Sequence, residues 1–205
     1  MRALIGYFEE QQRKAPGCWT KYFDANAAPD LILGVASLLN EEQFAQLAPI
    51  DKQKIEHIWE KTCRKASFQR IVSATGGFSL FSAITKFEKL VKGGSKTSMQ
   101  LREEFVEVCL SNVETFMALP HLSHLAELTK RREAVSIINR MLTDAKAVIP
   151  RPVLEVAARW LGRAIRVYHY NMCEPCEEYK PDADKRRRPI MLSLEKRGQY
   201  NLLLH

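Results

Sequence analysis

Apolar residues recur every three or four positions along most of the chain, and prolines and glycines interrupt the pattern. This spacing places apolar side chains on one face of an α-helix. The clearest case runs from Phe78 to Val91, where a stripe of phenylalanines indicates a helix packed on a core. Thr97 and Gln100 form a capping-box pair that predicts the start of another helix. This capped helix is predicted over residues 98–117, and further helices are predicted over residues 3–13, 29–39, 51–65, 120–145 and 152–168.

Only the C-terminal end changes to a pattern typical of strands. Residues 190–194 and 200–204 are apolar runs on either side of a short segment that contains Gly198, which suits a hairpin loop. The sequence therefore predicts a mainly α protein, a multi-helix globular bundle with a C-terminal β-hairpin. The glycines at 93 and 94 indicate a boundary, with an N-terminal helical region at 1–94 and a C-terminal region at 95–205, unless both form one continuous domain.

The chain is basic, and its positive charge is unevenly distributed. Its 205 residues carry a net charge of +7. Residues 51–100 hold 10 basic and 4 acidic side chains, and residues 151–205 hold 11 and 7. A one-sided positive field attracts nucleic acid or an acidic protein surface. No apolar run is long enough to span a bilayer and no secretory segment is evident, so we expect a cytoplasmic protein that does not engage a membrane.

Arginines follow one side of the helix predicted over residues 152–168. Arg159, Arg163 and Arg166 have the spacing i, i+4, i+7 and so share that side. Guanidinium groups keep their charge and present fixed donors that suit phosphates, although a solvated face with Arg159 paired to Glu155 is the alternative. If the chain folds back, two later basic clusters join this row. The predicted nucleic-acid-binding residues are Arg159, Arg163, Arg166, Lys185, Arg186, Arg187, Arg188, Lys196 and Arg197.

A Cys-x-x-Cys pair follows this helix and could bind zinc. Cys173 and Cys176 would supply two ligands, His169 a third, and His205 a fourth if the hairpin folds back. A second Cys-x-x-Cys is missing, and two reduced cysteines without metal are the alternative. Zinc is therefore the only cofactor that the sequence suggests.

Three functions are compatible with these patterns. The first is a non-enzymatic nucleic-acid-binding protein, or a subunit of a larger nucleoprotein complex, that contacts DNA or RNA phosphates through the basic C-terminal surface. The order of helix, loop and hairpin is loosely similar to the winged-helix layout. The second is a helical adaptor or inhibitor that docks on an acidic protein. The third is an enzyme with Cys173 and His169 as reactive groups, for which no catalytic motif is found. We predict the first, with the second as its alternative.

Overall fold

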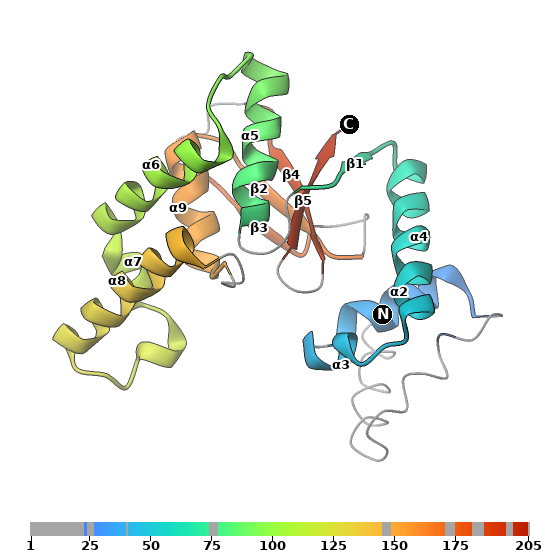
Figure 1. The fold of residues 1–205 in the computed structure, drawn as a ribbon, viewed down its shortest axis with the longest axis horizontal. Coiled ribbons are helices and arrows are strands. Elements are labelled where there is room, and N and C mark those ends of the chain that lie inside the picture. The colour runs from blue at the N-terminus through green and yellow to red at the C-terminus, as the bar shows by residue number, and fades with distance from the viewer. Residues whose placement is uncertain are drawn as a thin grey trace.

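A hairpin of two buried strands forms the centre of the sheet (Figure 1). Strand β4 (Ile190–Glu195) pairs antiparallel with strand β5 (Gln199–Leu204), and Leu192 lies opposite Leu202. The predicted hairpin is confirmed. The computed structural model describes residues 23, 27–39, 41–73, 78–144, 149–170, 175–181, 187–195 and 199–204.

Three further strands complete a five-stranded mixed sheet in the order β1-β5-β4-β2-β3. Strand β1 (Gln69–Ile71) pairs antiparallel with β5. Strand β2 (Ile165–Tyr168) pairs parallel with β4, and strand β3 (Glu177–Tyr179) pairs antiparallel with β2. The sheet thus joins strands from the middle of the chain to strands from its end.

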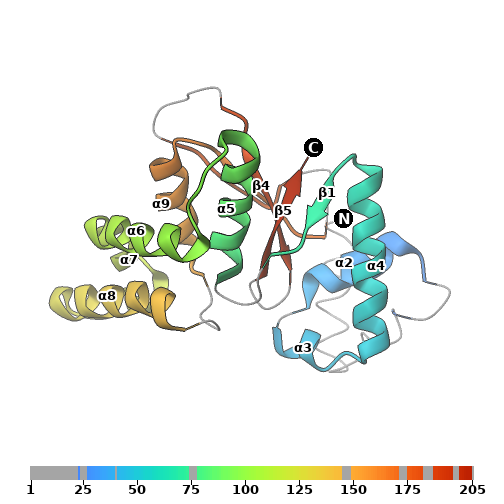
Figure 2. The same ribbon diagram turned by 45° about the horizontal axis from the view of Figure 1, so that its top comes forward.

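Helices cover both faces of the sheet (Figures 1 and 2). One face carries α5 and α9, with α6, α7 and α8 packed behind them, and the other face carries α4 and α2. The structure is therefore layered as helices, sheet and helices. The helices are α2 (Pro29–Leu38), α3 (Glu41–Ala45), α4 (Pro49–Lys65), α5 (Ser79–Lys92), α6 (Ser98–Ser111), α7 (Val113–Met117), α8 (Glu127–Thr143) and α9 (Arg151–Leu161).

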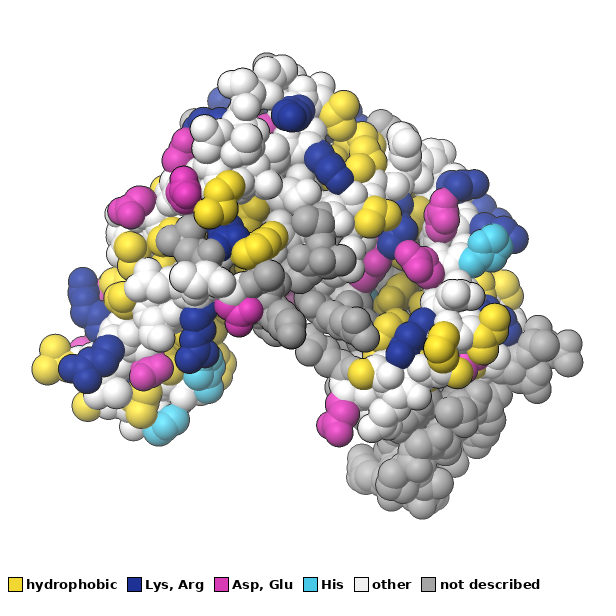
Figure 3. All heavy atoms as spheres, in the orientation of Figure 1, with side chains coloured by type: hydrophobic (Ala, Val, Ile, Leu, Met, Phe, Trp, Pro, Cys, Tyr) yellow, Lys and Arg dark blue, Asp and Glu magenta, His cyan; other side chains and the backbone are white. Residues whose placement is uncertain are grey.

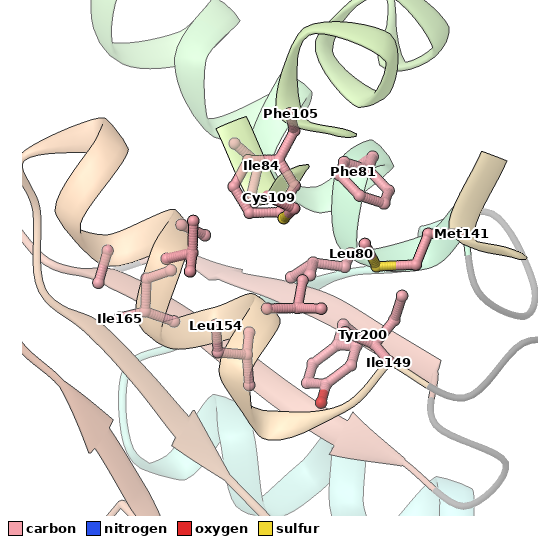
Figure 4. Packing of buried hydrophobic residues seen from close by; sticks show 14 of the residues in the cluster. Leu80, Phe81, Ile84, Phe105, Cys109, Met141, Ile149, Leu154, Ile165 and Tyr200 are labelled. Atoms are coloured by element: carbon pink, nitrogen blue, oxygen red, sulfur yellow. The ribbon is translucent and has the colours of Figure 1, made fainter. Parts of the chain in front are cut away.

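Alternate residues of the central strands enter two separate cores. Leu192 and Leu202 belong to the core beneath α5 and α9, whereas Met191 and Leu203 belong to the core beneath α2 and α4. This division follows from the two-residue repeat of a strand. Figure 4 shows the first core, where side chains from α5, α6, α9 and the sheet meet.

The prediction of a mainly α bundle is only partly correct. The described residues do form eight α-helices, but they also form a five-stranded sheet, which makes the fold α/β. The two hairpin strands are apolar runs on either side of a glycine, so the sequence indicates them. Strands β1 and β3 have three residues each and lie at the edges of the sheet, so they give no recognisable pattern. The apolar residues of β2 continue the pattern of α9.

The helix predicted over residues 152–168 is too long. Helix α9 ends at Leu161 because Gly162 adopts a left-handed conformation, with φ of 58°, and caps it. The chain then continues as strand β2, in which Ile165 and Val167 are β-branched residues that favour strands. The arginines assigned to one helix therefore do not share a helical side.

Other predicted helix boundaries agree with the structure to different degrees. The capping box at Thr97 is present, and α5 matches the phenylalanine stripe. Residues 120–122 instead form a 3₁₀ turn, and α8 begins only at Glu127. The helix predicted over residues 3–13 lies outside the described part of the chain. Within that part, no helix is both long and apolar enough to cross a bilayer.

Two glycines offer a matched test of backbone conformation. Gly93 caps α5 with φ of 66°, whereas Gly34 lies inside α2, and neither has an atom within 4 Å of an added Cβ. Gly93→Ala is expected to lower the free energy of unfolding by about 1–2 kcal/mol, because only the left-handed backbone is strained. Gly34→Ala should raise it by about 1 kcal/mol through helix propensity. Urea unfolding measures both, and equal effects would contradict this assignment.

Candidate functional site

Buried polar side chains gather where the start of α5 meets strand β5. The backbone N–H of Tyr200 donates to the hydroxyl of Ser79 at 2.9 Å. The backbone N–H of Ser73 donates to the Oδ1 atom of Asn201 at 2.8 Å. Ser73, Ser79 and Asn201 are all buried, in a protein whose core is otherwise largely apolar. We call Ser73, Ser79, Gln199 and Asn201, together with the backbone of Tyr200, the α5 polar cluster.

The end of strand β1 explains why this cluster forms. The ladder between β1 and β5 ends where Ile71 pairs with Leu202. Beyond that point the chain leaves the sheet, and side chains of Ser79 and Asn201 satisfy the buried N–H groups of Tyr200 and Ser73. Buried backbone donors need such partners. The cluster therefore has a structural role, and it also places a hydroxyl at a helix terminus.

Ser79 is the first residue of α5, a helix of 14 residues. The N-terminus of a helix carries free N–H groups and a partial positive charge, which together stabilise negative charge. Ser79 has no exposed surface in this conformation. Any reaction at its hydroxyl therefore requires the surrounding chain to open.

Two amide side chains, Gln199 and Asn201, flank Tyr200 on strand β5, and the N–H of Tyr200 donates to this hydroxyl. Asn201 Oδ1 also accepts from Gln199 Nε2 at 3.5 Å. Within the described residues, the Nδ2 atom of Asn201 and the hydroxyl of Ser73 have no hydrogen-bond partner. Neither amide can take up a proton near neutral pH. The cluster thus offers a hydroxyl, amide donors and acceptors, and a helix terminus.

An ion network supports the same sheet edge from the α4 side. Arg70, on β1, donates from Nε and Nη2 to the two carboxylate oxygens of Glu195 at 2.6 and 2.8 Å. It also contacts Glu56 of α4 at 3.2 Å. The side chains of Arg70 and Glu195 are 6% and 14% exposed, so this pair is largely removed from water. It ties β1 to the end of β4.

The described cysteines are poor nucleophiles. Burial raises the pKa of Cys63 and of Cys109 to about 12. Cys176 is exposed, but partial burial of its thiol and then the charge of Glu177 raise its pKa as well. A thiol reacts as its thiolate, so each of these shifts lowers reactivity at neutral pH.

Alkylation at pH 8 tests whether these thiols are buried and protonated. Cys63 and Cys109 are expected to stay unmodified by iodoacetamide in the native protein, since a pKa near 12 leaves them almost entirely protonated. Cys176 should react more slowly than free cysteine but faster than the other two. Peptide mass spectrometry measures all three, with urea-unfolded protein as the control. Rapid native labelling of Cys63 or Cys109 would contradict the burial seen here.

The three arginines predicted to share a helical side lie on separate elements. Arg159 is on α9, Arg163 follows the end of that helix, and Arg166 is on β2. Arg159 hydrogen-bonds Glu155, and Arg166 donates to Glu178 at 2.8 Å. Arg163 is only 7% exposed. Arg159 and Arg166 are therefore paired with glutamates, and Arg163 is buried.

The other predicted basic residues are only partly described. Arg187 and Arg188 are exposed, and the carbonyl of Arg188 accepts from Arg163 at 3.0 Å. This bond connects the segment before β4 to the end of α9. The remaining four predicted residues, Lys185, Arg186, Lys196 and Arg197, lie outside the described part of the chain.

The zinc hypothesis stays a prediction. Cys173 and His205 lie outside the described residues. Of the other two proposed ligands, His169 is half-buried and Cys176 is exposed. In the part of the chain that can be described, no group of three or more His, Cys, Asp or Glu side chains could hold a metal ion.

Comparison with known proteins gives a likeness at the level of structure. No protein-family model and no curated sequence matches the chain. Among solved structures, the OTU domain of OTUD1 matches with a TM-score of 0.50 and 21% sequence identity, over 80% of this chain and 99% of that domain. The chain has the fold of an OTU domain.

This likeness corrects the predicted function. The sequence suggested a non-enzymatic nucleic-acid-binding protein, or an adaptor that docks on an acidic surface, and both predictions are wrong. They depended on arginines converging on one unneutralised surface. Arg159 and Arg166 instead pair with glutamates, Arg163 is buried, and the chain has the fold of an OTU domain.

Sequence reasoning missed the whole α5 polar cluster. The sequence pattern places Ser79 in a helix packed on a core and Asn201 in a hairpin strand. One usable signal existed, because the hairpin register pairs Ser193 with Asn201, two polar residues inside otherwise apolar strands. Both are fully buried. Paired polar residues in buried strands indicate a site that needs an explanation.

Proposed function

We propose that this chain is a hydrolase that acts on ubiquitin or on a ubiquitin-like protein. Deubiquitinases with the OTU fold are cysteine proteases that bind ubiquitin. The observation that carries the proposal is the structural likeness, which extends over 99% of the OTU domain and 80% of this chain. A match of that extent involves the complete domain and not a shared substructure.

We assign the reaction to the N-terminus of α5. Acyl transfer needs a nucleophile and N–H donors for the oxyanion that forms at the attacked carbonyl. The first turn of α5 has N–H groups without a partner inside the helix, and Ser79 supplies a hydroxyl at the same end of the helix. The described cysteines are disfavoured by their raised pKa values. Ser79 is therefore our candidate nucleophile.

The proposed reaction is hydrolysis of an amide at the C-terminus of the bound protein. The Ser79 oxygen forms a bond to the carbonyl carbon, the C–N bond breaks, and the amine leaves with the proton of the hydroxyl. Water then hydrolyses the ester and restores the hydroxyl. Within the described residues, the only hydrogen-bond partner of this hydroxyl is the N–H of Tyr200. No imidazole or carboxylate of a described residue is bonded to it to take its proton. We therefore expect slow turnover, because a positioned base contributes about 10²–10⁴-fold.

Two measurements test this function. Calorimetry with unmodified ubiquitin reports binding, and ubiquitin with a fluorogenic C-terminal amide reports hydrolysis. We expect binding and slow hydrolysis by the natural protein, and loss of hydrolysis in Ser79→Ala. The matched control is Ser111→Ala, which removes an exposed hydroxyl at the opposite end of a neighbouring helix.

Two outcomes would overturn parts of the proposal. Absence of ubiquitin binding by the natural protein would remove ubiquitin as the substrate. Hydrolysis that survives Ser79→Ala but is lost after alkylation of the thiols would move the nucleophile from Ser79 to a cysteine.

A further inference from the structure

Arg102 is a buried cation that has no carboxylate partner among the described residues. It lies on α6, and only 3% of its surface is exposed. Within the described residues, its Nε and Nη2 atoms have no hydrogen-bond partner. Burial lowers its pKa, and only the charge of neighbouring Glu103 acts in the opposite direction. Buried guanidinium groups are costly unless they are paired, so this one requires an explanation.

The guanidinium lies at the N-terminus of α5. Its Cζ atom is 3.7 Å from the centre of the Phe78 ring, and Phe78 is the residue directly before Ser79. Two sources of positive potential therefore meet at this point, the arginine and the end of a 14-residue helix. Helix N-termini bind anions through their free N–H groups and their dipole. The combination predicts an anion as the missing partner.

Arg70 shows how the same two atoms of another arginine in this protein bind a carboxylate. It uses its own Nε and Nη2 atoms to hold both carboxylate oxygens of Glu195, at 2.6 and 2.8 Å. The same pair of donors is unused in Arg102. A planar guanidinium edge matches the two oxygens of a carboxylate and binds them in parallel.

We propose that Arg102 and the N-terminus of α5 bind a carboxylate of the ligand. The identity of that carboxylate rests on the proposed function: amide hydrolysis at Ser79 releases a protein with a new C-terminal carboxylate at this end of the helix. Arg102 then acts as a ligand-binding residue that retains the product. Ser79 and Arg102 are both buried in this conformation, so binding of the carboxylate requires the surrounding chain to open.

The carboxylate site can be tested without ubiquitin. N-acetylglycine and its uncharged amide are titrated into ¹⁵N-labelled protein, and the arginine Nε–H resonances are followed. We expect a saturable shift with the carboxylate and none with the amide. Arg102→Gln should weaken binding at least tenfold. Arg131→Gln is the matched control, because Arg131 is exposed and paired with Glu114 on the surface, and should bind as the natural protein does.

A variant that keeps the positive charge and a check of folding complete the test. Arg102→Lys keeps the charge but loses the two-donor edge, so it should also bind N-acetylglycine more weakly. Circular dichroism verifies that each variant is folded. Equal binding of acid and amide, equal binding by Arg102→Gln, or tighter binding of inorganic phosphate would overturn the carboxylate site. If N-acetylglycine binds through Arg102 while ubiquitin does not bind, the proposed function fails and the carboxylate site stands.

Discussion

Replacing Arg70 with methionine is expected to lower the free energy of unfolding by about 3–5 kcal/mol. The substitution leaves the carboxylate of Glu195 largely buried, with 14% of its side chain exposed, and without its two-donor partner. Of the described residues, only the Ser193 hydroxyl, at 3.3 Å, would still donate to this carboxylate, so most of its lost hydration would not be compensated. The connection between β1 and β4 is lost as well. Urea unfolding of the two proteins measures the difference.

Two controls separate this pair from ordinary surface charges. The exposed pair Arg131 and Glu114 has side chains that are 60% and 69% exposed, so Arg131→Met should cost less than about 1 kcal/mol. Replacing both Arg70 and Glu195 with apolar residues should recover most of the lost stability, because no charge is then left buried and unpaired. A cost below about 1 kcal/mol for Arg70→Met would show that water solvates Glu195 in solution.

The sequence predicted those parts of the fold that local chemistry determines. The capping box at Thr97 begins α6, and the phenylalanine stripe from Phe78 defines α5, because each depends on residues within a few positions. Strand β1 has three residues and pairs with the last strand of the chain, so no nearby residue predicts it. Strand β2 follows α9 closely, and its apolar residues continued the helical pattern across Gly162.

The candidate site was less predictable because it depends on contacts between distant segments. The hydrogen bond between Ser79 and Tyr200 spans 121 positions, and no local pattern indicates it. The prediction that Arg159, Arg163 and Arg166 share one side of a helix was wrong for a related reason, because α9 ends at Leu161 and Arg166 lies on β2. The hairpin register was within reach of the sequence, and it would have paired Ser193 with Asn201.

Replacing Ser79 with cysteine and Gln199 with histidine is expected to raise turnover of a ubiquitin C-terminal amide about 10²–10⁴-fold. A thiol ionises more readily than a hydroxyl, and the N-terminus of α5 favours the thiolate. The side chain at position 199 already bonds the Oδ1 atom of Asn201, at 3.5 Å. An imidazole held there by Asn201 would provide the base and its orienting partner that thiol proteases use.

Three comparison variants decide whether this gain comes from the α5 polar cluster. Ser79→Cys alone lacks a base and should be slower than the double variant, and adding Asn201→Ala should remove most of the gain by leaving the imidazole unoriented. Ser111→Cys with Gln199→His places the new thiol at the C-terminal end of α6, where the helix dipole disfavours a thiolate. The double variant should gain activity as pH rises through the histidine pKa of about 6.5. A double variant no faster than the Ser111→Cys control would exclude the N-terminus of α5 as the reaction centre.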